Sequence, residues 1–254
     1  MIPTQSSLAS LALRVRAARA AVYAAGELVG RTGIRTPTWP AGLTQPAGDV
    51  LRDLVIREGA RRTLEVGTGL GLSSLAIVDG LCTVGAEGGK AVQHFTIDPT
   101  PQWCDHAGVE LLSTSGAASI TRFIQEESAL ALPCLIGEGQ TFDFAFIDGV
   151  HQFDGVLVDL FFALRLVKQG GLIVMDDHWM PSVQAVLAFG VTNLGLELEL
   201  FDSNGPGKRL VALRPNTNAS QRSWDHFVDF TRRDLPPYPW RGLAAATDPS
   251  TARA

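Results

Sequence analysis

Three aspartates stand where apolar, strand-like runs end. Asp148 follows the run Phe142–Ile147, and the adjacent Asp176 and Asp177 follow Leu172–Met175. Adjacent carboxylates at a partly desolvated strand end repel each other and raise each other's pKa. Neighbouring strands lie about 4.8 Å apart, so all three side chains can converge on one point. A divalent cation would offset the repulsion, and carboxylates without cysteine favour Mg²⁺, Mn²⁺ or Ca²⁺. The alternative is that Asp148 and Asp177 cap the following helices while Asp176 is solvated.

A histidine stands close to these acids. His151 follows Asp148 by three residues, and an imidazole with an unperturbed pKa near 6.5 is largely neutral at pH 7 and can accept a proton. We take His151 and Asp148 as candidate catalytic residues. Ligation of the metal, a contact with substrate and a purely structural role remain open for His151. His178 is a weaker candidate base, and Trp179 and Met180 are candidate pocket walls or simple packing residues.

A glycine-rich loop follows the first predicted strand. The segment Glu65-Val-Gly-Thr-Gly-Leu-Gly71 precedes a helix that starts near Ser73, and its glycines let the backbone turn sharply and approach a ligand. The spacing is GxGxG, whereas the dinucleotide fingerprint needs its third glycine where Leu72 stands. Glu65 would repel a pyrophosphate but suits a ligand with an ammonium and a sulfonium group. Asp98 ends the next strand, where it would accept hydrogen bonds from ribose hydroxyls. The alternative makes both acids ordinary helix caps or solvated strand ends.

The composition narrows the class of protein. The chain has 254 residues, 46% of them hydrophobic, and a formal net charge of −5 without a long basic run. This disfavours nucleic acid as a partner and favours a small-molecule substrate. Three cysteines without a CxxC pair argue against a disulfide framework or a zinc ribbon and suit the cytoplasm. Arginines within the amino-terminal apolar pattern argue against a signal peptide or a membrane span.

The central part of the chain alternates between apolar runs and helical patterns. We expect buried strands at Thr63–Val66, Ala91–Ile97, Ser119–Ile124, Phe142–Ile147 and Leu172–Met175. We expect helices at Leu72–Leu81, Pro101–Leu112, Ala129–Leu135, Phe153–Val167 and Pro181–Leu194. This alternation predicts an α/β fold, a doubly wound and mostly parallel sheet covered by helices on both faces. The runs Leu196–Phe201 and Lys208–Leu213 flank SNGPG, so the sheet should end in an antiparallel strand.

The flanking segments have different patterns. Leu8, Leu11, Val15, Ala18, Val22 and Ala25 form one face of an expected helix that needs a partner, either the main domain or a second subunit in a homodimer. Arg14, Arg16 and Arg19 fall mainly on other faces. Residues 30–48 read as an irregular loop or lid. The expected organisation is a helix and lid at 1–48, a cofactor-binding domain at 49–214 and an extension at 215–254. In that extension Trp224, Phe227, Val228 and Phe230 suggest a helix and the last dozen residues suggest disorder.

Two parts of the chain resemble known enzymes. LTQPAGDVLRDLVIREGARRTLEVGTGLGLSS is similar to the opening of the catechol and caffeoyl-CoA O-methyltransferases. DFAFIDGVHQFDGVLVDL, followed by LVKQGGLIVMDD, resembles the bacterial macrocin and aminocoumarin sugar O-methyltransferases. From about Thr44 to Arg214 the chain thus resembles the class I S-adenosylmethionine-dependent methyltransferases. The resemblance implies a Rossmann-like, seven-stranded sheet with an inserted antiparallel last strand.

The resemblance also assigns cofactor contacts. It implies that Gly67, Gly69 and Gly71 line the methionine moiety, that Asp98 holds the ribose, and that the Glu127-Ser128 region lies beside the adenine. The full expected set of S-adenosylmethionine contacts is Glu65, Gly67, Thr68, Gly69, Gly71, Ser73, Asp98, Glu127, Ser128 and Asp148.

In the metal-dependent relatives, an acid ending the fourth strand and an Asp-Asn or Asp-Asp pair ending the fifth hold Mg²⁺. Asp148, Asp176 and Asp177 match those positions one by one. The catechol-type relatives carry a lysine, regarded as the general base, at the position of His151. That departure leaves open whether His151 acts as the base.

We therefore expect an S-adenosylmethionine-dependent O-methyltransferase of secondary metabolism that uses Mg²⁺, or Mn²⁺ or Ca²⁺. Its acceptor would be a hydroxyl of a small molecule such as a natural product, a sugar or a catechol. Three alternatives remain: a metal-independent N- or C-methyltransferase, a nicotinamide dehydrogenase, and a non-catalytic cofactor-binding protein.

Overall fold

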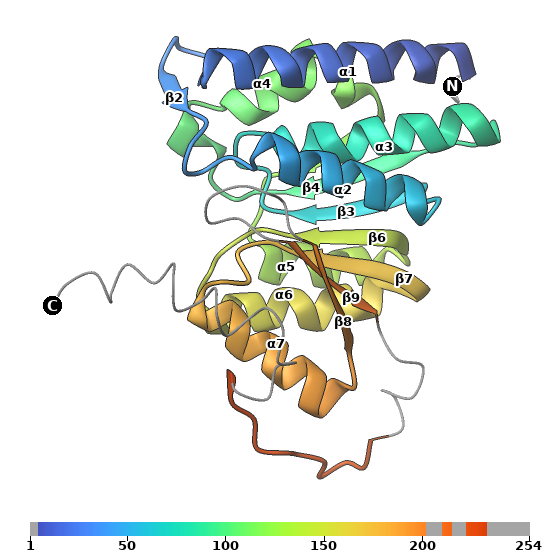
Figure 1. Ribbon diagram of the computed structural model, residues 1–254, viewed down its shortest axis with the longest axis vertical. Coiled ribbons are helices and arrows are strands. Elements are labelled where there is room, and N and C mark those ends of the chain that lie inside the picture. Colours follow the sequence, from blue (N-terminus) through green and yellow to red (C-terminus); the bar gives the residue numbers. More distant parts are fainter. Residues whose placement is uncertain (1–4, 202–209, 215–221, 233–254) are drawn as a thin grey trace, which may run out of the picture.

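The chain folds around one seven-stranded sheet, as the computed structural model shows for residues 5–201, 210–214 and 222–232 (Figure 1). The strand order is β5-β4-β3-β6-β7-β9-β8. The strands are β3 (Arg62–Val66), β4 (Gln93–Ile97), β5 (Thr121–Ile124), β6 (Phe142–Ile147), β7 (Val167–Met175), β8 (Glu197–Phe201) and β9 (Leu210–Arg214). The first five pair in parallel, and β9 is inserted antiparallel between β7 and β8. The predicted fold class is confirmed.

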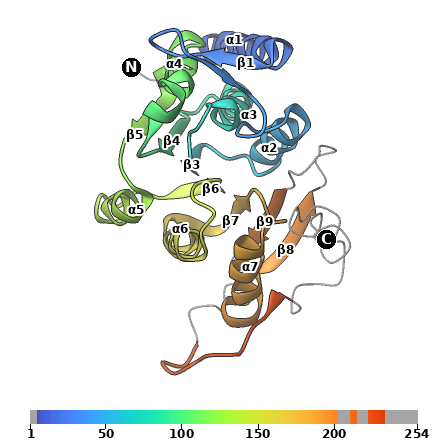
Figure 2. The same cartoon turned by 90° about the vertical axis from the view of Figure 1, so that its left-hand side faces the viewer.

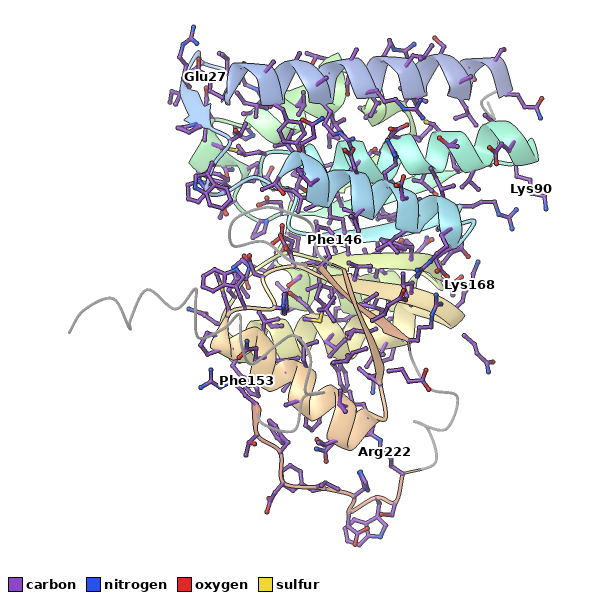
Figure 3. The ribbon with its side chains drawn as sticks, viewed as in Figure 1. Glu27, Lys90, Phe146, Phe153, Lys168 and Arg222 are labelled. Carbon is purple, nitrogen blue, oxygen red and sulfur yellow. The ribbon has the colours of Figure 1, made fainter. Side chains whose placement is uncertain are left out.

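Helices cover both faces of the sheet (Figure 2). One layer contains α1 (Gln5–Ala25), α2 (Gln45–Arg57), α3 (Leu72–Gly88) and α4 (Ala107–Thr114). The other contains α5 (Ser128–Gly137), α6 (Phe153–Leu166) and α7 (Pro181–Leu194). Because side chains alternate along a strand, Phe144 and Phe146 pack in the first layer and Ala145 and Ile147 in the second. Figure 3 shows Phe146 at the centre of the molecule. Both faces of β6 are therefore apolar.

The amino-terminal helix packs along α3 of the same chain, so the main domain is its partner. Leu8, Leu11 and Val15 are buried, as the helical periodicity predicts. The prediction for Arg19 was wrong, because this side chain is buried and forms a salt bridge with Asp49 at the start of α2. A long arginine stem can pack on apolar surface while its guanidinium reaches a carboxylate, and helical periodicity alone does not reveal that partner.

The expected lid is more ordered than its composition suggests. It contains β2 (Arg35–Pro37), which pairs with β1 (Glu27–Val29), and α2 begins at Gln45 because Thr44 caps it. The Asp105 carboxylate accepts a hydrogen bond of 2.6 Å from the amide of Thr32. These contacts join the segment to the sheet domain.

Two expected helices differ from the structure. The predicted helix at 101–112 is divided into η1 (Pro101–Cys104) and α4, because Asp105 and His106 have φ values of 52° and 60°. The expected helix around residues 224–230 is absent from the described residues 222–232. There the backbone of Val228 exchanges two hydrogen bonds with the Asn193 side chain, at 2.8 and 2.9 Å. The disorder expected of the last dozen residues lies outside the described residues.

No helix among the described residues combines the length and the apolarity needed to cross a membrane.

Replacing Leu8 with alanine should lower the free energy of unfolding by about 2–5 kcal/mol, because its side chain is 1% exposed between α1 and α3. Leu13→Ala is the matched control on the same helix, since Leu13 is 66% exposed, and it should change stability by about 0.5 kcal/mol or less. Urea unfolding measures both values. Equal values for the two variants would contradict the packing of α1 on this domain.

Candidate active site

A cavity of about 1090 Å³ opens beyond the carboxyl ends of the parallel strands. In open α/β sheets this edge is the usual place for ligands. Phe153, at the start of α6, lies toward this end of the molecule, and Lys168, near the start of β7, lies at the opposite end (Figure 3). The volume is at the upper end of the roughly 300–1,000 Å³ typical of ligand pockets, so a cofactor and an acceptor both fit.

The predicted glycine loop forms one wall of the cavity. Gly67, Gly69 and Gly71 have φ values of 95°, 48° and 74°, which glycine adopts most easily. A Cβ atom added at Gly67 would lie 2.1 Å from the carbonyl oxygen of Asp148. Only glycine therefore lets this loop pass the end of β6 at that distance. Gly71 precedes α3, whose first amide groups face the same region.

Asp98, the residue expected to hold a ribose, lies at the cavity wall. Its carboxylate accepts hydrogen bonds from the amides of Gly69, at 2.8 Å, and Thr100, at 2.9 Å. These bonds fix the glycine loop against the end of β4, and a carboxylate has further lone pairs for ribose hydroxyls. Thr68 and Ser73, also predicted, line the same wall.

Glu65 does not line the cavity, which corrects the prediction that it contacts the cofactor. It is fully buried, accepts a hydrogen bond from the Ser74 hydroxyl, and lies 3.1 Å from Nε2 of His94. His94 Nδ1 lies 2.9 Å from Thr63 Oγ1. Strand alternation explains the difference, since Leu64 packs in the layer of α5, α6 and α7 and Glu65 faces the other side. Thr63 pairs with His94 across the neighbouring strands β3 and β4. This pairing is the signal that could have revealed the buried group of Thr63, Glu65 and His94.

The expected adenine-binding residues also line the cavity. Glu127 immediately precedes α5, and Ser128 is its first residue. They lie next to the wall that Asp98 forms, so the residues assigned to methionine, ribose and adenine follow one another around one cavity.

Asp148, His151 and Asp177 form a cluster in which one possible ligand atom of each lies within 4.8 Å of the others. His151 Nε2 is 3.0 Å from Asp177 Oδ2 and 3.6 Å from Asp148 Oδ1. All three residues line the cavity. Two of the three predicted metal ligands are thus brought together, with the histidine as the third member.

Asp176 is not part of this cluster, which corrects its place in the predicted metal site. Asp176 is 2% exposed and does not line the cavity. The next residue, Asp177, has a φ of 50°, so the chain turns there and directs Asp177 into the cluster. Trp179 Nε1 donates a hydrogen bond of 2.9 Å to Asp177 Oδ1. His178 is buried and also absent from the lining, whereas Trp179 and Met180 line the cavity.

The electrostatics of the cluster differ from the prediction for His151. Interactions with Asp148 and Asp177 raise the pKa of His151 to about 10, although burial acts in the opposite direction. With nothing else bound, the imidazole is protonated at pH 7 and offsets part of the carboxylate charge. The premise that the pKa of His151 is unperturbed was wrong. A bound cation would compete with the proton on this imidazole.

A further aspartate, outside the cluster of Asp148, His151 and Asp177, lies beneath the cavity. Asp159 on α6 is fully buried, and its Oδ2 lies 3.4 Å from the place that a Cβ atom of Gly149 would occupy. Burial raises the pKa of Asp159 to about 6, against an opposing interaction with Ser128. Asp159 is fully buried in α6 and does not line the cavity, as a structural role requires.

The comparisons with known proteins agree with this architecture. A family model described as a methyltransferase domain matches residues 64–178. The solved structure of cofactor-bound Rv0187 from MTB has a TM-score of 0.61 and 22% identity, covering 80% of this chain and 90% of that chain. The O-methyltransferase TomG from Streptomyces achromogenes, involved in tomaymycin synthesis and solved with SAM, has a TM-score of 0.58, 21% identity and the same coverage.

The O-methyltransferase from Bacillus cereus, solved with SAH, has a TM-score of 0.57 and 18% identity, covering 81% of this chain and 90% of that chain. No curated protein matches the chain significantly. At these identities the solved structures establish the fold.

Gly67→Ala should lower the free energy of unfolding by about 1–3 kcal/mol more than Gly69→Ala. Both positions have positive φ, which costs an alanine about 1–2 kcal/mol, but only the Gly67 side chain would collide with the Asp148 carbonyl. A Cβ atom at Gly69 meets nothing within 4 Å, which makes it the matched control. Denaturant unfolding of both variants measures the difference. Equal losses would show that the loop does not approach β6 as closely as described.

Asp159→Asn should stabilise the protein at pH 8 and change it little at pH 4. The raised pKa means that the folded state holds the Asp159 proton more tightly than the unfolded state, so stability falls as the pH rises from about 4 to about 6. A shift of about two pKa units corresponds to at most about 3 kcal/mol. The free energy of unfolding of the variant and of the unchanged protein, measured at both pH values, tests the sign of this stability change.

Asp143→Asn is the opposite control. Although burial acts against it, the salt bridge to Lys168 and the amides of Arg61 and Arg62 lower the pKa of Asp143. This variant should lose stability at pH 8. If Asp159→Asn also lost stability at pH 8, the assignment of an uncompensated buried carboxyl group would be wrong.

Proposed function

We propose that this chain, a methyltransferase that uses S-adenosylmethionine, transfers the methyl group to a hydroxyl oxygen of a small molecule at a site that holds a divalent cation. The methyltransferase domain at residues 64–178 contains the glycine loop, Asp98 and the acid cluster. The observation that carries the proposal is the convergence of Asp148, His151 and Asp177 on the wall of the same cavity. A cytoplasmic location, a role in secondary metabolism and a homodimer stay predictions.

The cavity supports a definite placement of the methyl donor. Gly67, Gly69 and Gly71 would face its methionine part, with Asp98 at the ribose and Ser128 at the adenine. Backbone amides of the loop and of the α3 amino terminus would receive the carboxylate of the methionine part. In this orientation the sulfonium would lie toward the end of β6, where Asp148 lies.

Two of the three distances between donor atoms of the cluster suit a divalent cation. Ligands bound at about 2.1 Å lie roughly 3.0 to 4.2 Å apart, depending on the angle at the ion. The distances from His151 Nε2 to Asp177 and Asp148, 3.0 and 3.6 Å, fall in this range. When bound, the ion would lower the pKa of the acceptor hydroxyl and hold it in place.

The chain's own residues would orient the acceptor. Asp148 and Asp177 would fix the position of the reacting oxygen, and the Trp179 hydrogen bond holds the Asp177 carboxylate. With an ion bound, His151 Nε2 would be one of its ligands, so the proton of the acceptor hydroxyl would leave to solvent water. Much of the rate acceleration would come from holding donor and acceptor next to each other in one cavity.

Apolar and aromatic residues in the cavity lining favour an apolar acceptor. Trp39, Leu43, Trp179 and Met180 line the cavity, and aromatic walls stack well on flat ring systems. A catechol-like or aromatic natural product with two neighbouring oxygens suits this lining better than a free sugar.

A metal-independent methyltransferase is the second candidate. One observation favours it, since protonated His151 already lies between the two carboxylates and offsets part of their charge. Such an enzyme would act on nitrogen or carbon acceptors as readily as on oxygen. Chelation separates the two candidates.

The test is methyl transfer from S-adenosylmethionine to a panel of caffeate and catechol derivatives, each paired with its methoxy-blocked and amine analogue. We expect an O-methyl ether as product, and we expect EDTA to lower the rate about 100-fold and added divalent ion to restore it. Asp148→Asn should lower the rate by a similar factor, while Asp53→Asn, an exposed carboxylate on α2, should not. Full activity in EDTA, or products methylated only on nitrogen, would favour the second candidate.

A further inference from the structure

The proposed metal site differs from the one that the sequence suggested in its third ligand. Asp148 and Asp177 supply carboxylate oxygens, but Asp176 lies outside the cavity lining. The third member of the cluster is Nε2 of His151, a nitrogen atom. An expected set of three oxygens is therefore replaced by two oxygens and one imidazole nitrogen.

This replacement changes which ions suit the site. Mg²⁺ and Ca²⁺ bind almost exclusively through oxygen ligands. Imidazole nitrogen suits first-row transition ions, whose affinity for a given nitrogen and oxygen site rises from Mn²⁺ through Co²⁺. We infer that the Asp148–His151–Asp177 cluster selects a first-row transition dication over Mg²⁺ and Ca²⁺. This inference rests on the proposed function, because it specifies the ion that the proposed site holds.

The surroundings hold the three side chains in position for this role. The Ser182 hydroxyl at the start of α7 donates a hydrogen bond to the carbonyl oxygen of His151. Trp179 occupies Oδ1 of Asp177, so Oδ2 is the oxygen nearest His151. The amide of Asp148 donates a hydrogen bond of 2.8 Å to the Val66 carbonyl. Of these bonds, the one from Trp179 meets a carboxylate of the proposed site, and partners of that kind orient metal ligands and commonly change metal affinity 10- to 100-fold when removed.

The cluster is also partly open. The His151 side chain is 35% exposed, whereas those of Asp148 and Asp177 are 14% and 7% exposed. Three protein ligands on the cavity wall leave further coordination positions for oxygen atoms of an acceptor. An ion held there would contact both the protein and the acceptor.

The experiment is isothermal titration of the chelator-stripped full chain with Mn²⁺, Co²⁺ and Mg²⁺, without any acceptor. We expect Co²⁺ and Mn²⁺ to bind at least 10-fold more tightly than Mg²⁺. His151→Gln should remove most of that preference, weakening Co²⁺ and Mn²⁺ at least 10-fold while Mg²⁺ changes less than three-fold. His226→Gln is the matched control, because His226 is exposed and outside the cavity lining.

A second readout identifies the nitrogen ligand directly. Pulsed electron paramagnetic resonance of the Mn²⁺ complex should show coupling to one imidazole nitrogen, absent in His151→Gln. Thermal unfolding of each variant checks that it is folded before titration.

The remaining outcomes separate this inference from the proposed function. If Mg²⁺ bound as tightly as Mn²⁺ and Co²⁺, or if Asp176→Asn removed binding and His151→Gln did not, the inference would be overturned and the proposed metal site would stand. If no ion bound, the metal requirement of the proposed function would fall together with the inference.

Discussion

Charge compensation at the ends of β6 and β7 is the constraint on which the site depends. Asp148 and Asp177 come from neighbouring strands whose ends are joined by the Asp176 amide and the Ile147 carbonyl, so the fold itself brings two negative charges together. Something positive has to lie between them. The protonated imidazole of His151 supplies one charge, and a divalent ion that displaced its proton would supply two. The same geometry thus accounts for a stable cluster without an ion and for the proposed site for a cation.

The rest of the cavity is arranged around that point. The Gly67 backbone passes so close to the Asp148 carbonyl that the glycine loop and the acid cluster form one wall. Asp98 fixes the loop through the Gly69 amide. Both faces of the central strand β6 are covered by apolar layers, which hold its carboxyl end in place. In the proposed reaction, this arrangement would hold the two reactants next to each other beside a fixed charge.

Sequence reasoning located the residues whose place in the cavity is set by the end of a strand. Apolar runs followed by acids located Asp98, Asp148 and the end of β7, and the glycine spacing located the loop. It failed where a single backbone angle, or the side of the sheet that a strand residue faces, determines where a side chain lies. The φ of Asp177 determines which of two adjacent carboxylates enters the cavity, and strand alternation turns Glu65 toward His94. It also failed for contacts distant in sequence, since Arg19 is buried against Asp49 and Val228 is held by Asn193. Local periodicity carries no information on such partners.

The most direct measurement of charge compensation by a cation is anomalous diffraction at the manganese edge from crystals grown with Mn²⁺ and S-adenosylhomocysteine. The predicted result is one anomalous peak bonded to Asp148, Asp177 and Nε2 of His151 on the wall that also holds the cofactor. A crystal with the cofactor in place, no anomalous peak, and His151 still bridging the two carboxylates would contradict it.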